Sequence, residues 1–125
     1  MKFQTINPAT EEVIAEYEVM PKDKVLDAAK KSHAAFRQWK ELDVSERAPY
    51  FRNLAQVLRQ NKERYAELIT LEMGKPIKQS LTEIEKCAWG AEVYADNAAK
   101  WLEEEIVQTN GKKHIVAFEP LGCIL

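Results

Sequence analysis

The longest regular pattern in this sequence is an apolar repeat in its second half, and it limits what the chain can fold into. Its members recur in alternating steps of three and four residues, at Leu81, Ile84, Ala88, Ala91, Ala95, Ala98 and Leu102. This spacing predicts an α-helix with one continuous apolar face. Cys87, Tyr94 and Trp101 lie beside the row and widen it, which favours a helix packed on two sides over an isolated coiled-coil strand. The small side chains allow a neighbouring helix to approach closely.

Three shorter helical patterns precede this repeat, so that helices are expected over about residues 21–102. The first pattern begins at Pro21, and the second follows Asp43, a residue well suited to cap a helix. Asn61 is expected to interrupt the second helix and to cap a third. That helix is expected to stop at Gly74, because glycine tolerates the left-handed conformation after a helix and the proline two residues on cannot continue one.

Strand-like segments flank the helices on both sides. Residues 3–19 are expected to form a hairpin around an Asn-Pro-Ala-Thr turn, with one apolar face that needs a cover. A second hairpin is expected around Asn110-Gly111, which lies between β-rich runs at residues 105–108 and 114–119.

The last three residues, Cys123-Ile124-Leu125, form a wholly apolar run of the kind that opens a strand buried on both faces. Such a strand needs neighbouring strands and covering helices before it can be buried. We therefore expect the sequence to be a truncated one. The alternative is a short tail packed against the chain's own helices.

Composition and charge exclude several classes of function. Of the 125 residues, 18 are Lys or Arg and 20 are Asp or Glu, which gives a formal net charge of −2 with both signs interspersed. No basic surface for nucleic acid or anionic lipid is therefore expected. No run approaches the roughly 20 apolar residues that cross a bilayer, and the first residues lack the apolar stretch of a secretory signal. We expect a cytoplasmic protein that binds neither nucleic acid nor membrane.

The sequence assigns no residue a catalytic, cofactor-binding or metal-binding role. Cys87 and Cys123 lie in apolar surroundings and are expected to be reduced, inert core thiols. His33 and His114 are too far apart in the sequence to suggest a metal cluster. The acidic run at residues 103–105 is expected to be a solvated helix end, because consecutive side chains point in different directions. Neither a Gly-x-Gly-x-x-Gly motif nor a phosphate-binding P-loop is present.

Four motifs are together highly specific in their order and spacing. They are Ile6-Asn7-Pro8-Ala9-Thr10, Ser45-Glu46-Arg47-Ala48, Leu71-Glu72-Met73-Gly74-Lys75-Pro76 and Phe118-Glu119-Pro120-Leu121-Gly122. Through them the whole chain resembles the amino-terminal segment of the aldehyde dehydrogenase family. The stretch from Cys87 to Ala98 makes it most similar to the succinate-semialdehyde group of that family.

The resemblance implies an α/β fold of which this chain is the amino-terminal portion only. Residues 1–103 would belong to the cofactor-binding domain, residues 104–119 would form a β arm for oligomerisation, and residues 120–125 would start the first strand of the nucleotide-binding fold. The partners it implies are the remainder of the polypeptide and, through the arm, other subunits of a homo-oligomer.

The resemblance also implies an activity, the oxidation of an aldehyde to a carboxylic acid with NAD or NADP as hydride acceptor. The aldehyde in this group is succinate semialdehyde. In the family a cysteine thiolate attacks the carbonyl, a glutamate activates water and an asparagine holds the oxyanion. None of these groups matches a position in this chain, so the chain alone is expected to be inactive and to bind no cofactor. The alternative is a stand-alone interaction module that pairs through its β arm.

Overall fold

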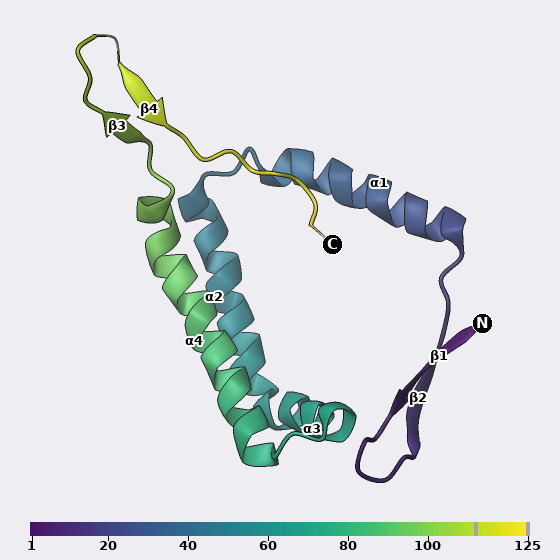
Figure 1. Cartoon of the computed structure of the whole chain (residues 1–125). Coiled ribbons are helices and arrows are strands. Elements are labelled where there is room, and N and C mark those ends of the chain that lie inside the picture. The colour runs from purple at the N-terminus through teal and green to yellow at the C-terminus, as the bar shows by residue number, and fades with distance from the viewer. Residues whose placement is uncertain (112, 125) are drawn as a thin grey trace.

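The computed structural model describes residues 1–111 and 113–124, in which four helices lie between two β-hairpins in the sequence (Figure 1). The elements are, in order, β1 (Lys2–Ile6), β2 (Val13–Glu18), α1 (Lys22–Trp39), α2 (Val44–Gln60), α3 (Lys62–Met73), α4 (Ile77–Trp101), β3 (Glu105–Val107) and β4 (His114–Val116). The expected α/β composition and the helices over about residues 21–102 are therefore confirmed.

The core lies between α2 and α4, which run side by side (Figure 1). Ala55 of α2 and Ala88 and Ala91 of α4 are buried there, and Leu58 packs against them. Because alanine side chains are short, the two helices can approach each other closely. The apolar repeat of α4 is therefore confirmed as a packing seam, with Leu102 at its exposed end.

Asn61 divides the second helix from the third, as expected, but its side chain caps the end of α2 and not the start of α3. Its backbone leaves the helical range, with φ −113°, and its side-chain amide donates a hydrogen bond to the Val57 carbonyl at 2.9 Å. The side chain therefore closes α2, and the described residues form no side-chain cap at the start of α3. Further along, Ser80 of α4 is fully buried and its hydroxyl lies 3.0 Å from that of Thr70 in α3. This contact holds α3 against the first turns of α4.

The expected stop of the third helix is confirmed at Gly74. This residue follows α3 in the left-handed conformation, with φ 68°. A residue with a Cβ adopts that conformation only at a cost, which glycine avoids. The chain can therefore turn directly from α3 into α4.

The hairpin expected over residues 3–19 is confirmed as the antiparallel pair β1 and β2. Phe3 stands opposite Tyr17 in the ladder, and the ammonium of Lys2 lies 2.9 Å from the carboxylate of Glu16. The described residues leave one end of this hairpin uncovered, because Phe3 and Tyr17 are both more than half exposed, whereas the next facing pair on that side, Thr5 and Ala15, is half-buried.

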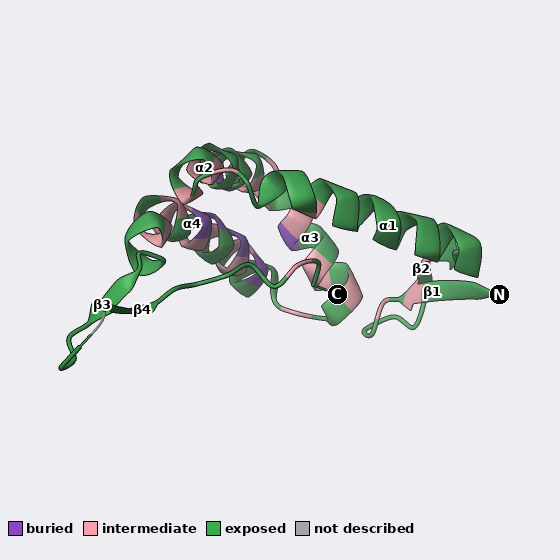
Figure 2. Cartoon of the chain, turned by 90° about the horizontal axis from the view of Figure 1, so that it is seen from above, coloured by how far each residue is buried: buried purple, intermediate pink, exposed green. Residues whose placement is uncertain are grey.

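Little of the chain is buried, as Figure 2 shows. Among the described residues the buried ones lie in α2, α3 and α4, and α1 contains none. The accessible surface is 10536 Å², whereas a compact monomer of 14.4 kDa exposes about 6,800 Å². The chain by itself therefore leaves an unusually large surface in contact with solvent.

The segment that follows β4 returns toward α1 (Figure 1). Residues 117–124 have no regular secondary structure, so the strand expected from residue 120 onward does not form among them, and Leu125 lies outside the described residues. A strand needs a paired neighbour, and the described strands pair only within the two hairpins. Leu121 is 93% exposed and Ile124 is 80% exposed. The helices of this chain therefore do not shield these side chains.

Candidate functional site

An apolar groove of about 630 Å³ lies between α1 and the segment at residues 121–124. We call it the α1 groove. Val25, Ala29 and Phe36 line it from the helix, and Leu121 and Ile124 line it from the segment. Phe36 is half-buried and the other four residues are exposed. Because exposed apolar surface is unfavourable in water, a groove of this kind favours contact with another protein surface.

Two polar side chains meet in the α1 groove, where Ser32 Oγ lies 3.1 Å from Cys123 Sγ. Cys123 and Cys87 are both free thiols, and both are exposed. The expectation that they are buried core thiols is therefore wrong for this chain, because the described residues place no cover over either. A serine hydroxyl is not the base that a nucleophilic thiolate needs. The contact gives Cys123 no catalytic partner.

The other residues considered from the sequence lie apart from one another. His33 is on α1, with its ring centroid 6.1 Å from that of Phe36, and His114 opens β4. Residues 103–105 are exposed, as expected, but the expected helix end is wrong for Glu105, because α4 ends at Trp101 and Glu105 is the first residue of β3. Over the described part of the chain, no three His, Cys, Asp or Glu side chains are grouped so that they could hold a metal ion.

No helix in the described part of the chain combines the length and apolar character needed to cross a membrane.

The second hairpin, β3 and β4, projects from the end of α4 (Figure 1). It is antiparallel, with Ile106 opposite Ile115, and every residue of both strands is exposed. Among the described strands, each of the two pairs only with the other. Both outer edges therefore present backbone N–H and C=O groups that could accept a further strand.

The hairpin expected around Asn110-Gly111 is confirmed, but its turn differs from the tight one that this pair favours. The ladder already ends at Val107 and His114, so both strands are shorter than the β-rich runs in the sequence. A two-residue type I′ turn needs positive φ at both central residues, and φ of Gly111 lies outside that range. The strands are therefore not joined by that tight turn.

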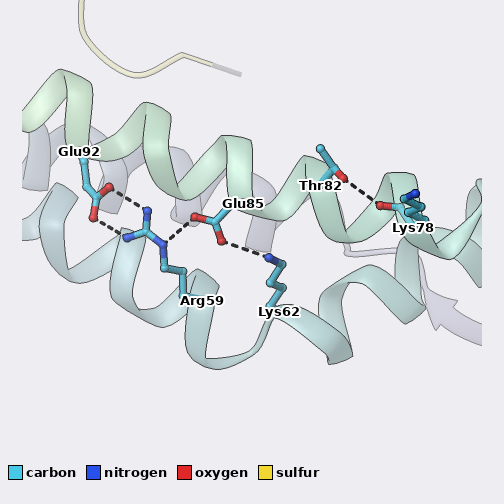
Figure 3. A network of polar contacts seen from close by, with 6 residues as sticks. All are labelled: Arg59, Lys62, Lys78, Thr82, Glu85 and Glu92. Atoms are coloured by element: carbon cyan, nitrogen blue, oxygen red, sulfur yellow. Dashed lines mark hydrogen bonds and ion pairs between the residues drawn. The ribbon is translucent and has the colours of Figure 1, made fainter.

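A network of ion pairs links α2 and the start of α3 to α4 (Figure 3). The Arg59 Nε donates to Glu85 at 2.9 Å, and both terminal guanidinium nitrogens donate to Glu92, one of them at 2.8 Å. Lys62 donates to the other carboxylate oxygen of Glu85 at 3.2 Å.

The hydrogen bonds of this network change the acidity of both carboxyl groups. The hydrogen bond from Arg59 has the larger effect on Glu85, and together with the bond from Lys62 it holds the pKa of Glu85 below its ordinary value. The bond from Arg59 does the same to the pKa of Glu92. In this network the cations of Arg59 and Lys62 pair with the carboxylates of Glu85 and Glu92 near the surface. The pairs connect α2 and α3 to α4, and all four charges are neutralised by their partners, so the network is structural and not catalytic.

Sequence patterns did not predict the α1 groove or the ion-pair network. Ser32 and Cys123 are 91 positions apart, and Arg59 and Glu85 are 26 apart. The apolar face of α1 was one signal for the groove, but helical periodicity is a local property and does not identify what lies across from it.

Comparisons with known proteins cover all or nearly all of the chain. The sequence profile of the Aldehyde dehydrogenase family matches residues 1–125. The probable succinate-semialdehyde dehydrogenase (NADP+) of Synechocystis is 34% identical over 125 residues, which are 100% of this chain and 28% of that protein. The succinate semialdehyde dehydrogenase (NAD(P)+) of Escherichia coli is 34% identical over 121 residues, which are 97% of this chain and 26% of that protein.

The fold matches as well. The crystal structure of succinic semialdehyde dehydrogenase from Streptococcus pyogenes, in complex with NADP+, has a TM-score of 0.85 and 29% identity over 92% of this chain and 26% of that one. This chain thus spans about a quarter of the length of the relatives it matches. Since the profile covers every residue, the chain belongs to the aldehyde dehydrogenase family.

Proposed function

We propose that this chain is the amino-terminal scaffold of a longer enzyme, an NAD(P)-dependent dehydrogenase that oxidises succinate semialdehyde to the carboxylic acid. The observation that carries the proposal is the family match over residues 1–125, together with the much greater length of the relatives. The relatives from Synechocystis, Escherichia coli and Streptococcus pyogenes are all named for this aldehyde, and their names include NADP+ or NAD(P)+.

The α1 groove supports a scaffold role. We assign residues 1–103 to the cofactor-binding domain and residues 120–125 to the start of the first strand of its nucleotide-binding fold. A strand from the same polypeptide, paired beside residues 121–124, would satisfy their backbone groups and cover the groove. Full burial of Leu121 and Ile124 would then stabilise the folded enzyme by about 1.5–3 kcal/mol for each side chain.

The second hairpin supports a role in assembly. We assign residues 104–119 to an arm that pairs with a strand of another subunit, which makes the whole enzyme a homo-oligomer. The arm has unpaired edges for main-chain hydrogen bonds and exposed side chains, Ile106 and Ile115, for apolar contact.

The chemistry is proposed to lie outside these residues. Binding of a dinucleotide needs a tight turn or helix end whose backbone N–H groups face the phosphates, usually with closely spaced glycines. The glycines of this chain are Gly74, Gly90, Gly111 and Gly122. They are too widely spaced for such a turn, so the residues present do not fit the cofactor. Neither Cys87 nor Cys123 is given a catalytic role, and no step of the reaction is assigned to this chain.

A chimera tests the proposal. Residues 1–125 replace the matching segment of the Synechocystis relative, and reduction of NADP+ by succinate semialdehyde is measured. We expect turnover by the chimera and none by the chain alone. Turnover by the chain alone would contradict the proposal. So would a chimera that assembles to the size of the relative, by light scattering, and yet is inactive.

A second measurement keeps the test decisive if the chimera does not fold. The relative without its matching segment is co-expressed with this chain as a separate polypeptide, and we expect the two to co-purify. A monodisperse monomer that does not bind the shortened relative would count against the scaffold role. It would count equally against a stand-alone interaction module, which no observation favours over a part of an enzyme.

A further inference from the structure

Asn110 and Gly111 lie between the two strands of the second hairpin, beyond the last ladder pair of Val107 and His114. Both are exposed. Among the described residues, no backbone hydrogen bond outside the helices and strands involves either of them. The Asn110 side chain and the N–H of Gly111 are therefore not held apart by a ladder or a helix.

We propose that Asn110 is a site of spontaneous deamidation through a cyclic imide formed with Gly111. The backbone nitrogen of Gly111 bonds to Cγ of Asn110, and the bond from Cγ to Nδ2 breaks. Nδ2 of Asn110 takes up the proton lost from the Gly111 N–H and leaves as ammonia. Water then opens either carbonyl of the imide, which gives aspartate or isoaspartate. The new carboxylate adds one negative charge to a chain whose formal net charge is −2.

Gly111 makes this attack sterically accessible. A glycine has no Cβ to shield its nitrogen from the preceding side chain. A Cβ built on Gly111 would meet no atom of any residue beyond its two chain neighbours within 4 Å, and φ of Gly111 lies outside the left-handed range. Residues beyond the two chain neighbours therefore leave room for a side chain at this position, and an alanine fits there without strain.

The other asparagines of the chain lack this combination. Asn7 precedes Pro8, which has no N–H to react. Asn53 and Asn97 lie inside α2 and α4, where the helix holds the following N–H in a hydrogen bond. The side chains of Asn97 and Asn61 each donate to a backbone carbonyl one turn earlier, at 2.8 and 2.9 Å. These four residues serve as internal controls.

The modification changes the arm in two ways. Aspartate places a charge at the tip of the β3–β4 hairpin, and isoaspartate also inserts an additional carbon atom into the main chain. The inference needs only the exposed Asn-Gly pair, so it stands or falls independently of the proposed function.

The experiment uses the full chain, folded and incubated at body temperature in mildly alkaline buffer prepared with heavy-oxygen water. Peptide mapping by mass spectrometry locates the incorporated oxygen, and fragmentation distinguishes aspartate from isoaspartate. We expect Asn110 to react first and to give both products. The variant Gly111→Ala should react roughly tenfold more slowly, because its Cβ hinders the nitrogen.

Three results would overturn the proposal. One is that another asparagine reacts as fast as Asn110. Another is that Gly111→Ala leaves the rate unchanged, which would rule out attack by this nitrogen. The third is that Asn110 stays intact in the folded chain over a period in which a peptide of residues 105–116 is converted, because the fold would then protect it.

Discussion

The ring of Pro8 lies against Gly74, since a Cβ added to Gly74 would stand 3.0 Å from Cγ of Pro8. This contact brings the turn of the first hairpin onto the junction between α3 and α4. It explains why that position needs glycine for two separate reasons, the left-handed φ of 68° and the lack of room for a side chain.

Gly74→Ala should lower the free energy of unfolding by about 1–3 kcal/mol, because alanine in the left-handed region is strained. Urea denaturation followed by helical circular dichroism measures this loss. The matched control is Gly90→Ala in α4, where an added Cβ has no contact within 4 Å outside its chain neighbours and the nearby backbone of its own helix. That change should stabilise the chain by about 0.5–1 kcal/mol. The interpretation of Gly74 would be wrong if both variants had the same stability.

Arg59→Met should make the stability of the chain less dependent on pH. Because the pKa values of Glu85 and Glu92 are lowered in the folded chain, their contribution is present above the ordinary glutamate pKa of about 4.3 and is lost as the pH falls through the lower folded values. The variant should have a lower Tm than the wild type at neutral pH, and the difference should shrink on acidification. Thermal unfolding over a pH series checks this.

Arg52→Met is the control for the ion-pair network. Arg52 forms a single exposed pair with Asp96, also between α2 and α4, at 2.7 Å. One exposed pair contributes little to stability, so the loss in Tm should be smaller than for Arg59→Met. Equal losses from the two variants, or a loss from Arg59→Met that persists in acid, would contradict the role given to the network.

Ala88→Leu should destabilise the chain by about 1–3 kcal/mol, because the added isopropyl group has no room in the seam between α2 and α4. Ala88 is completely buried. Ala99→Leu places the same side chain on an exposed position of the same helix and should be nearly neutral. Denaturant titration compares the two, and a neutral Ala88→Leu would show that the helices are not closely packed.

Ile106→Lys should weaken assembly of the chimera described above, because it places a charge where the arm is proposed to meet another subunit. Gln108→Lys adds the same charge just beyond β3 and should have a smaller effect. Light scattering over a range of concentrations measures the subunit dissociation. A chimera that stays fully assembled with Ile106→Lys would remove the second hairpin from the interface.

Local pattern was enough to predict the helices and the seam of α4, because helical spacing alone places Ile84, Ala88 and Ala91 on one face. It was not enough for the partner of Arg59, since an ion pair between two helices depends on how they pack. The cysteines show the same limit. Apolar neighbours in the sequence suggested burial for Cys87 and Cys123, but burial depends on elements that come from elsewhere to cover them.

All buried residues of the described chain lie between Ala55 and Ala91, within α2, α3 and α4. Their contacts all lie within this one stretch of the chain, and contacts of moderate sequence separation form faster than more distant ones. During synthesis on the ribosome this three-helix unit could therefore become structured as soon as α4 emerges. The apolar residues of α1 that line the α1 groove, among them Val25, Ala29 and Phe36, would have no cover at that stage, so a nascent chain of this length should be a good client for chaperones.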